Sequence, residues 1–395
     1  MGWERFFTDH AAASIACFIV FTILVCGLAT IMTKFAVAIK DKAKISDGVI
    51  GGILIGAITS IPELITSIAV IVESSKNTEV HAYSVFGDVI GSNMFCFLIM
   101  AVVLLVTVVI FKRREANQIN TVSLVFMIVG TIFCFLAGIF DNNGFVYGNG
   151  KPLSPLVWHG FNFFTIFIFL SYAMAVFSML FGAKATIRGP NGKRIKPKQH
   201  MLPPPSKKIK TTRFVYWNMP ILIILLIASV VLLTLSSLVL ATSCSGIITR
   251  ENLGEMFGRT LLLGMATSLP ELVAVVNLAV SRRYNLVIDS MVGSCAFNMT
   301  ILFIANIVYS ILYTSAAETT AMYFLDKDTL VQLVLFLLEA IFLVLYLVVN
   351  SGSVKRYLST KQTVVINSIL LSLTVASYAT YVVLGTLEQV GILPY

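Results

Sequence analysis

The chain has 395 residues, of which 57% are hydrophobic and 12% are charged. Soluble domains carry about 25% charged residues, so this composition excludes a protein that buries its apolar surface in one soluble core. The net charge of +9 does not indicate nucleic-acid binding, because the Lys and Arg residues lie in short segments between apolar runs, where they report membrane topology. The six cysteines form no CxxC pair, which argues against a disulfide framework or a zinc site.

Ten apolar runs are each long enough to cross a bilayer as an α-helix, which needs about 20 residues. The first run lacks a clear cleavage site, so we predict a retained span and not a signal peptide. The predicted spans are residues 11–38, 48–72, 82–111, 119–140, 153–181, 214–241, 253–281, 286–313, 330–349 and 362–387.

The longest polar stretch, residues 183–213, contains Gly189-Pro190, Pro197 and three consecutive prolines from Pro203. This composition is typical of a flexible linker and cannot form a packed domain. We therefore predict a basic, Pro-rich linker between two five-helix halves, residues 1–182 and residues 214–395.

The loop charges predict the orientation. Of the 28 Lys and Arg residues, 22 lie in the odd-numbered connections and 6 lie on the other face. The positive-inside rule then places the linker in the cytoplasm and both termini outside.

Spans 2 and 7 share a nine-residue pattern, G-x-x-T-S-[IL]-P-E-L, at residues 56–64 and 264–272. One span later a Gly-Ser pair recurs, at Gly91-Ser92 and Gly293-Ser294, each followed by a Phe at the same offset. The copies are five spans apart, an odd number, so they enter the membrane in opposite directions. Inverted repeats with interrupted helices near the midplane are the architecture of many secondary transporters.

Glu63 and Glu271 occupy the same position in the two copies. A carboxylate in mid-membrane costs at least about 2.5–3.5 kcal/mol on insertion scales, so each must recover that free energy from a partner. Within spans 2 and 7 the basic candidate is Arg259, about three turns before Glu271. A bound cation is the simpler partner. The alternative is a pair of structural acids bonded within the bundle.

Pro62 and Pro270 lack N–H groups and should free the carbonyls of Ile58 and Ala266, four residues back. Carboxylates, hydroxyls and free carbonyls together form a hard oxygen cage, which suits calcium with its 6–8 oxygen ligands. The hydroxyls could instead serve helix packing or back-bonding. They belong to Thr59, Ser60, Thr267 and Ser268.

These motifs resemble the two α-repeats of the sodium/calcium exchanger superfamily, the calcium:cation antiporters. The resemblance implies an all-α membrane protein of ten transmembrane helices in two inverted five-helix repeats. It implies that Glu63 and Glu271 bind calcium and that Thr59 and Thr267 offer backbone carbonyl oxygens. The remaining expected ligands, mainly at neighbouring monovalent-ion sites, are Ser60, Ser268, Ser92, Ser294 and Asn298.

The second motif departs from the family pattern, which usually runs G-S-N-x-x-N or G-S-N-x-x-D. The first copy ends in Cys96, and the second has Cys295 but keeps Asn298. Asp88 stands where the family usually has Asn. Sulfur suits sodium poorly, so the departures predict altered coupling-ion sites beside an intact pair of calcium-binding acids.

The sequence therefore predicts an antiporter that exchanges Ca²⁺ for Na⁺ or H⁺ by alternating access, embedded in a lipid bilayer. We expect no enzymatic activity, no cofactor and no nucleic-acid partner. An intramembrane aspartyl protease is an alternative suggested by Gly87-Asp88, but position 85 is Val and no Tyr-Asp occurs. A passive cation channel is a third possibility, which the inverted repeats disfavour. Glu339, midway along span 9, has no counterpart in the repeats.

Overall fold

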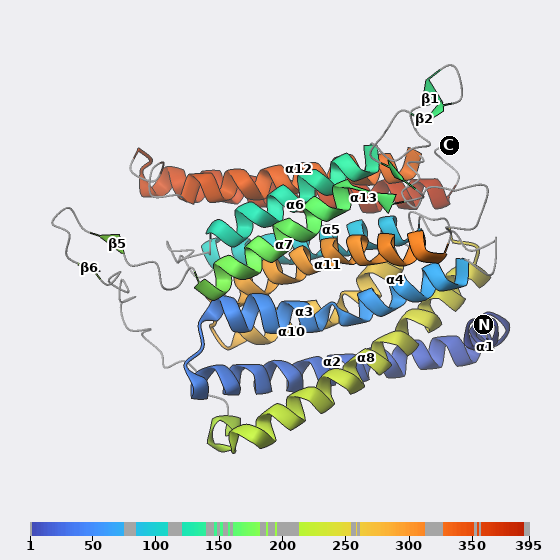
Figure 1. Ribbon diagram of the computed structural model, residues 1–395, viewed down its shortest axis with the longest axis horizontal. Helices are drawn as coiled ribbons and strands as arrows, with labels where there is room; N and C mark the ends of the chain where they lie inside the picture. Colours follow the sequence, from blue (N-terminus) through green and yellow to red (C-terminus); the bar gives the residue numbers. More distant parts are fainter. Residues whose placement is uncertain are drawn as a thin grey trace.

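The computed structural model describes most of the chain, and its helices lie side by side along one axis (Figure 1). The fold is all-α, as the sequence predicts. The described residues are 2–74, 84–109, 121–139, 146–147, 151–152, 157–158, 161–181, 187–188, 194–195, 213–253, 258, 261–312, 327–350, 354 and 357–390.

The helices of the first half are α1 (Gly2–Asp9), α2 (Ala11–Ala43), the π-helix η1 (Val49–Ile55), α3 (Gly56–Thr59), α4 (Ile61–Ser74), α5 (Ser84–Val109), α6 (Thr121–Ile139) and α7 (Phe164–Phe181). Those of the second half are the 3₁₀ turn η3 (Arg213–Tyr216), α8 (Met219–Arg250), α9 (Gly264–Thr267), α10 (Leu269–Val280), α11 (Tyr284–Leu312), α12 (Lys327–Asn350) and α13 (Thr360–Gln389).

Three groups of helices build the bundle. Helices α2 and α8 pack together along one side, and α12 and α13 pack together along the other (Figure 1). Between them, α11 contacts α5, α7 and the segments η1, α3 and α4. The first and the central group therefore contain helices of both halves, whereas α12 and α13 both belong to the second half. The motif-bearing helices lie in the middle of the bundle.

Each of the ten predicted spans contains an apolar helix within the described residues. Seven of these helices are long and apolar enough to cross a membrane, and the pair Leu261–Thr267 and Leu269–Val280, bent by 53°, makes an eighth span. The remaining two, Val125–Gly138 and Phe164–Leu180, are shorter apolar helices. The count of ten spans therefore stays a prediction at those two places.

The predicted span at residues 153–181 begins too early. Its helix α7 starts at Phe164, after a short hairpin of β3 (Val157–Trp158) and β4 (Phe161–Asn162). The physical reason is a helix cap, because the side-chain oxygen of Asn162 accepts a hydrogen bond from the Phe164 N–H at 3.0 Å. A second two-stranded hairpin precedes it, from β1 (Val146–Tyr147) and β2 (Lys151–Pro152).

The sixth span is also displaced from its prediction at residues 214–241. Helix α8 begins at Met219, with Pro220 in its first turn, and continues to Arg250. A proline suits the first helical turn because its missing N–H would have no partner there. The polar residues after Ala241 stay helical, and the Ser243 hydroxyl returns a hydrogen bond to the Val239 carbonyl at 2.6 Å.

Part of the predicted flexible linker forms a small hairpin. Strand β5 (Ile187–Arg188) pairs antiparallel with β6 (Arg194–Ile195), with Ile187 opposite Ile195. The turn sequence between them begins with Gly189-Pro190, which are strong turn formers. This hairpin lies at one end of the bundle, whereas α1 and the end of α13 lie at the opposite end (Figure 1).

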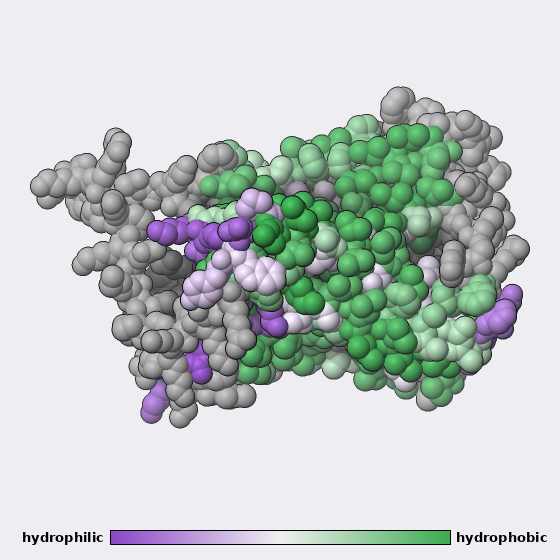
Figure 2. Space-filling model, turned by 90° about the horizontal axis from the view of Figure 1, so that it is seen from below, coloured by the Kyte–Doolittle hydropathy of each residue, from purple (hydrophilic) through white to green (hydrophobic). Residues whose placement is uncertain are grey.

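Figure 2 shows one face of the molecule, where apolar side chains cover the middle and hydrophilic ones lie toward the ends. Such a band matches the hydrocarbon core of a bilayer, in which polar side chains are costly. Exposed residues of this kind along α2 and α8 include Ile19, Val20, Ile23, Ile224, Ile227, Val231 and Leu235.

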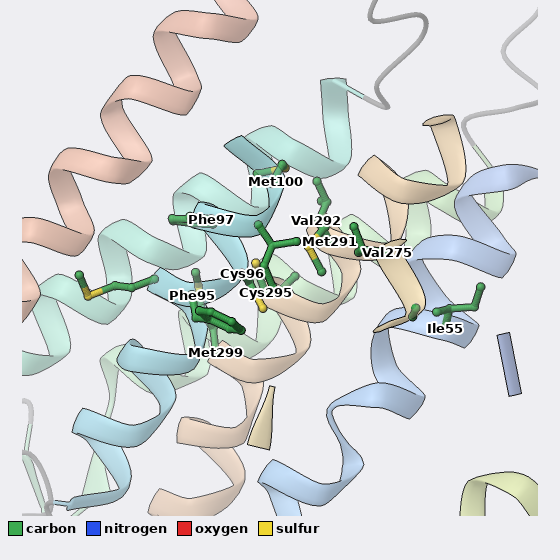
Figure 3. Packing of buried hydrophobic residues seen from close by; sticks show 14 of the residues in the cluster. Ile55, Phe95, Cys96, Phe97, Met100, Val275, Met291, Val292, Cys295 and Met299 are labelled. Carbon is green, nitrogen blue, oxygen red and sulfur yellow. The ribbon is translucent and has the colours of Figure 1, made fainter. Parts of the chain in front are cut away.

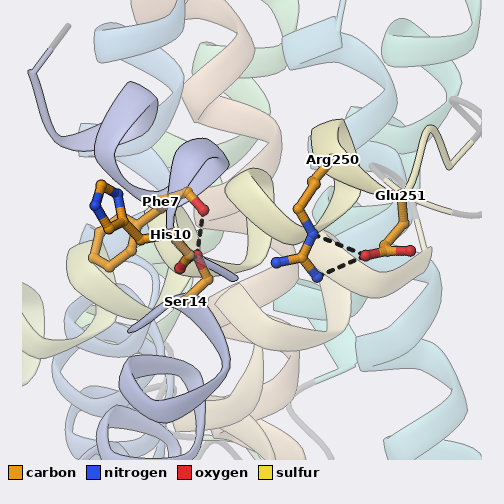
Figure 4. Close-up of polar contacts among 5 residues, drawn as sticks. All are labelled: Phe7, His10, Ser14, Arg250 and Glu251. Atoms are coloured by element: carbon orange, nitrogen blue, oxygen red, sulfur yellow. Dashed lines mark hydrogen bonds and ion pairs between the residues drawn. The ribbon is translucent and has the colours of Figure 1, made fainter. Parts of the chain in front are cut away.

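The N-terminal helix α1 packs against α8 beside the first turns of α2. At the turn between α1 and α2, the Ser14 hydroxyl donates hydrogen bonds to the carbonyls of Phe7 and His10 (Figure 4). Nearby, Arg250 donates to one oxygen of Glu251 through Nε at 2.9 Å and Nη2 at 2.6 Å. These contacts fix the end of the bundle where the chain begins.

Glycines let the motif-bearing helices of the two halves touch through their backbones. A Cβ added at Gly293 in α11 would lie 1.9 Å from the carbonyl oxygen of Gly52 in η1, and one at Gly56 would lie 2.6 Å from the Ser294 nitrogen. The equivalent contact of the second motif with the first half is looser, since a Cβ at Gly264 would lie 3.5 Å from the Ser92 nitrogen. Thus the first glycine of each nine-residue motif packs on the Gly-Ser pair of the other half.

We predict that Gly56→Ala destabilises the protein by about 1–3 kcal/mol, because the added methyl meets backbone atoms that cannot move aside. The matched variant Gly264→Ala should be neutral or slightly stabilising, since its methyl makes ordinary contacts and alanine favours a helix. Thermal unfolding midpoints of the detergent-purified variants measure both. Equal destabilisation by the two substitutions would contradict the asymmetric packing.

The charge distribution gives a second prediction, on topology. Reporters fused at Met1 and Tyr395 should be accessible from outside, and a reporter inserted in residues 183–213 should be accessible from the cytoplasm. Cytoplasmic termini would show that the orientation is reversed. Termini on opposite sides would show that the number of spans is odd.

Candidate ion-binding site

Both nine-residue motifs break their helix at the serine. Helix α3 ends at Thr59 and α4 begins at Ile61, and Ser60 between them has φ −94° and ψ 2°. In the other half, α9 ends at Thr267 and α10 begins at Leu269. Proline follows each break and removes an intrahelical donor, which is the physical cause of the interruption. The two breaks fall at the same position of the repeated sequence, but the chain bends by 53° only at the second, between Leu261–Thr267 and Leu269–Val280, while Val49–Val72 continues as one span.

The carbonyls expected to be free at the breaks are partly engaged. The N–H of Ser60 turns back to the Ile58 carbonyl, and the N–H of Ser268 turns back to those of Ala266 and Gly264. The prolines cannot donate the usual backbone hydrogen bond to the carbonyl four residues before them. The N–H group of the serine at each break donates to these carbonyls instead. These carbonyls therefore keep one lone pair available for a cation.

The threonine hydroxyls are used by the helices themselves. Thr59 Oγ1 donates toward the carbonyls of Ile55 at 3.0 Å and Gly56 at 3.1 Å, and Thr267 Oγ1 donates to Gly264 at 3.1 Å. This is the back-bonding alternative for their side chains. The Thr59 hydroxyl also interacts with the Glu271 carboxylate, so a direct role of the two threonines as ligands would rest on their backbone oxygens.

Glu271 is held by serines from two other helices. One of its oxygens accepts a hydrogen bond from Ser60 Oγ at 2.9 Å and from Ser294 Oγ at 3.2 Å, and these two hydroxyls lie 2.7 Å apart. Its second oxygen is buried and has no hydrogen-bond partner within the described residues. Glu271 is 1% exposed, so half of its carboxylate remains unsatisfied in the interior.

Glu63 is still less satisfied. It is 2% exposed, and neither of its oxygens has a hydrogen-bond partner in the described part of the chain. The Ser268 hydroxyl interacts with this carboxylate, but without full hydrogen-bond geometry, and the Glu271 charge repels it. No salt bridge reaches either glutamate among the described residues, which do not include Arg259.

A second polar group mirrors the first. The Ser92 hydroxyl lies 2.6 Å from that of Ser268 and accepts a hydrogen bond from Asn298 Nδ2 at 3.1 Å. The side-chain oxygens of Asn298 and Asn93 are buried and lack partners within the described part. Asn93 was not among the expected ligands, although its place in the Gly-Ser-Asn motif could have identified it.

The two cysteines that depart from the family pattern lie together. Cys96 of α5 and Cys295 of α11 are both fully buried, and their thiols interact directly (Figure 3). The Cys96 thiol also interacts electrostatically with the carboxylates of Glu63 and Glu271. The two cysteines lie far apart in the sequence, and only the fold brings them together. We call Cys96 and Cys295 the sulfur pair.

Two further acids lie near this centre. Asp88, on the first turns of α5, is partly buried and repels Glu63 electrostatically. The preceding residue, Gly87, accepts a hydrogen bond from Gln332 Nε2 of α12 at 2.7 Å. Glu339 lies further along α12, is fully buried, and has no partner for either oxygen within the described residues.

The fold brings together all nine expected site residues in the middle of the bundle. Glu63 and Glu271 each occupy the first turn of a half-helix, α4 and α10, where the positive end of the helix dipole favours an anion. Five buried side-chain oxygens of Glu63, Glu271, Asn93 and Asn298 have no partner within the described part. Orphaned carboxylate and amide oxygens are ligands that hard cations prefer.

The family profile described as "Sodium/calcium exchanger protein" matches residues 13–177 and 221–387. Among solved structures, the sodium-calcium exchanger NCX_Mj soaked with 2.5 mM Na⁺ and 0.1 mM Sr²⁺ has a TM-score of 0.55 and 16% identity, covering 95% of this chain and 99% of that one. The H⁺/Ca²⁺ exchanger CAX has a TM-score of 0.58 and 12% identity, covering 94% and 90%.

At these identities the likeness to solved structures shows a shared fold. A search of curated protein sequences found no significant match. The family profile, however, covers most of both halves, including both copies of each motif. The chain therefore belongs to the sodium/calcium exchanger family and is an integral membrane transporter that exchanges cations.

Proposed function

We propose that this protein is a secondary active antiporter that carries Ca²⁺ in one direction and Na⁺ or H⁺ in the other by alternating access. The observation that carries the proposal is the pair of buried, incompletely satisfied carboxylates, Glu63 and Glu271, contributed by the two halves. Two negative charges match one divalent ion. The same carboxylates can accept monovalent ions or protons when the divalent ion leaves, which is the interchange that an antiporter needs.

The surrounding groups support an oxygen-lined site. Ser60 and Ser294 orient one oxygen of Glu271 and leave the other for an ion. On the opposite side, Ser92 joins Ser268 to Asn298. These hydroxyls and amides would complete the ligands of calcium or of a neighbouring monovalent ion.

The division into a first half, a cytoplasmic linker and a second half belongs to the same proposal. The tight contacts at Gly56 and Gly293 join segments of opposite halves, and alternating access requires such paired elements to move relative to each other. Membership of a transporter family argues against the aspartyl protease. The inverted repeats favour a carrier over a fixed channel.

The direct test is calcium uptake into proteoliposomes under an imposed sodium gradient, compared with uptake under an imposed proton gradient. Net uptake against a calcium gradient should follow one of the two driving ions. Calcium movement that only ever dissipates its own gradient would show a channel. Calcium movement that ignores both gradients would refute the exchange.

We predict that Glu63→Gln and Glu271→Gln each abolish calcium transport while the protein stays folded, because each removes a charge that the divalent ion requires. Flux is measured in proteoliposomes and folding by thermal unfolding in detergent. Glu251→Gln, at an exposed side chain paired with Arg250, is the matched control and should transport normally. Full flux in either buried variant would remove that residue from the site, and loss of folding would favour a structural role.

The sulfur pair gives a further prediction about sodium. Cys96→Asp restores an oxygen of the family type and should make calcium flux depend more steeply on sodium, and Cys96→Ser should do so less. Because Cys96 lies against Cys295 (Figure 3), the double variant with Cys295→Asn should show the largest change. Flux across a sodium series at constant pH is the measurement. An unchanged sodium dependence in all three would mean that these side chains do not face the ions.

A further inference from the structure

Glu339 is a fully buried carboxylate of α12, and the mechanism proposed above does not use it. Both of its oxygens lack a hydrogen-bond partner within the described part of the chain. An isolated carboxylate costs several kcal/mol to bury, which is too much for a single ion with no compensation. Glu339 must therefore hold either a proton or a cation.

The groups that interact with Glu339 come from two other helices. Cys295 of α11 and Tyr378 of α13 interact with it electrostatically, and Tyr378 also interacts with Cys96 of α5. Helix α6, which also packs on α12, has Cys134 as its one titratable residue and carries no charge. No basic side chain among the described residues balances Glu339.

This environment favours a proton over a metal ion. A hard cation requires about six oxygens, whereas the side chains that interact with Glu339 are the Cys295 thiol and the Tyr378 phenol. A proton neutralises the carboxylate without further ligands.

The position of Glu339 connects it to the ion site. The sulfur pair lies between Glu339 and the ion site. Cys295 interacts electrostatically with Glu339, and Cys96 interacts electrostatically with Glu63 and Glu271. The two cysteines of the sulfur pair occupy positions where the family pattern usually has oxygen-bearing residues. The loss of a sodium-binding group and the presence of an unpaired acid therefore occur on the same side of the site.

We propose that Glu339 binds a proton that is exchanged against calcium, in place of a monovalent ion that the sulfur pair can no longer hold. In this scheme, with the site empty, the negative charges of Glu63 and Glu271 beyond the sulfur pair would disfavour a further negative charge at Glu339, because charges interact over longer distances in a medium of low dielectric constant. When calcium neutralises them, the O–H bond of Glu339 breaks, its electron pair stays on the carboxylate, and the proton passes to water in the ion pathway. The inference rests on the proposed calcium exchange and names its coupling ion.

The test is the number of protons released per calcium bound by the full-length protein in detergent. It is obtained from the calorimetric heats of calcium binding in buffers of different ionisation enthalpy. Glu339→Gln should still bind calcium but release one proton fewer than the parent. Glu251→Gln should release the same number as the parent, and Glu339→Asp should retain the release. An undiminished release in Glu339→Gln would overturn the proposal, since Glu339 would then be permanently neutral.

Infrared difference spectroscopy provides a second measurement on the parent and on Glu339→Asp, in case the amide variant does not fold. Calcium should remove a carboxylic acid C=O band, and that band should shift in frequency in Glu339→Asp. A band that does not shift would overturn the assignment.

The two proposals fail differently. If the parent binds no calcium, the proposed function fails, and a pH titration of the same band without calcium still tests the proton at Glu339. An acid band that does not titrate would show that Glu339 is permanently protonated, which refutes an exchangeable proton there. Binding of Zn²⁺ or Cd²⁺ that Glu339→Gln abolishes would instead assign a soft-metal site and overturn the proton.

Discussion

Two carboxylates held in an apolar bundle with too few hydrogen-bond donors are the constraint on which the rest of the structure depends. Glu63 and Glu271 are 2% and 1% exposed, and three of their four oxygens have no partner within the described residues. The free energy of burying such charges is so unfavourable that other groups must compensate it. The broken helices supply part of this compensation, since each glutamate lies in the first turn of a half-helix, near the positive end of its dipole. The remainder is left for a cation.

The compensation also requires both halves of the chain. Glu271, from the second half, is held by Ser60 from the first half and by Ser294 from α11. The serines can reach it because Gly52 and Gly56 let η1 and α3 approach the backbone of α11 more closely than any side chain would allow. Neither half could assemble this site alone, so the interleaving of the halves is part of the chemistry as well as of the packing.

The repeated motifs do not produce equal surroundings. The contact at Gly56 is tight and its counterpart at Gly264 is loose. Two pseudo-equivalent positions carry an amide in one copy and a thiol in the other, and Glu339 has no counterpart in the first half. An antiporter must bind two different ions in turn. This site has oxygen ligands on one side and the sulfur pair with Glu339 on the other, so its two sides differ in the ions that they can bind.

The sequence by itself determined the class of the protein, because apolar runs and charged loops depend only on local composition. It also predicted where the helices are interrupted, since a proline two residues after the serine removes an intrahelical donor in both copies, and it proposed Glu63 and Glu271 as the ion-binding acids. Helix ends set by caps, such as the start of α7 at Asn162, were placed less well. Only the tertiary structure decided that Cys96 meets Cys295, that Gly56 meets Ser294 and that Glu339 faces this pair. These contacts join residues far apart in the chain, and their partners depend on how whole helices pack, which no local pattern encodes.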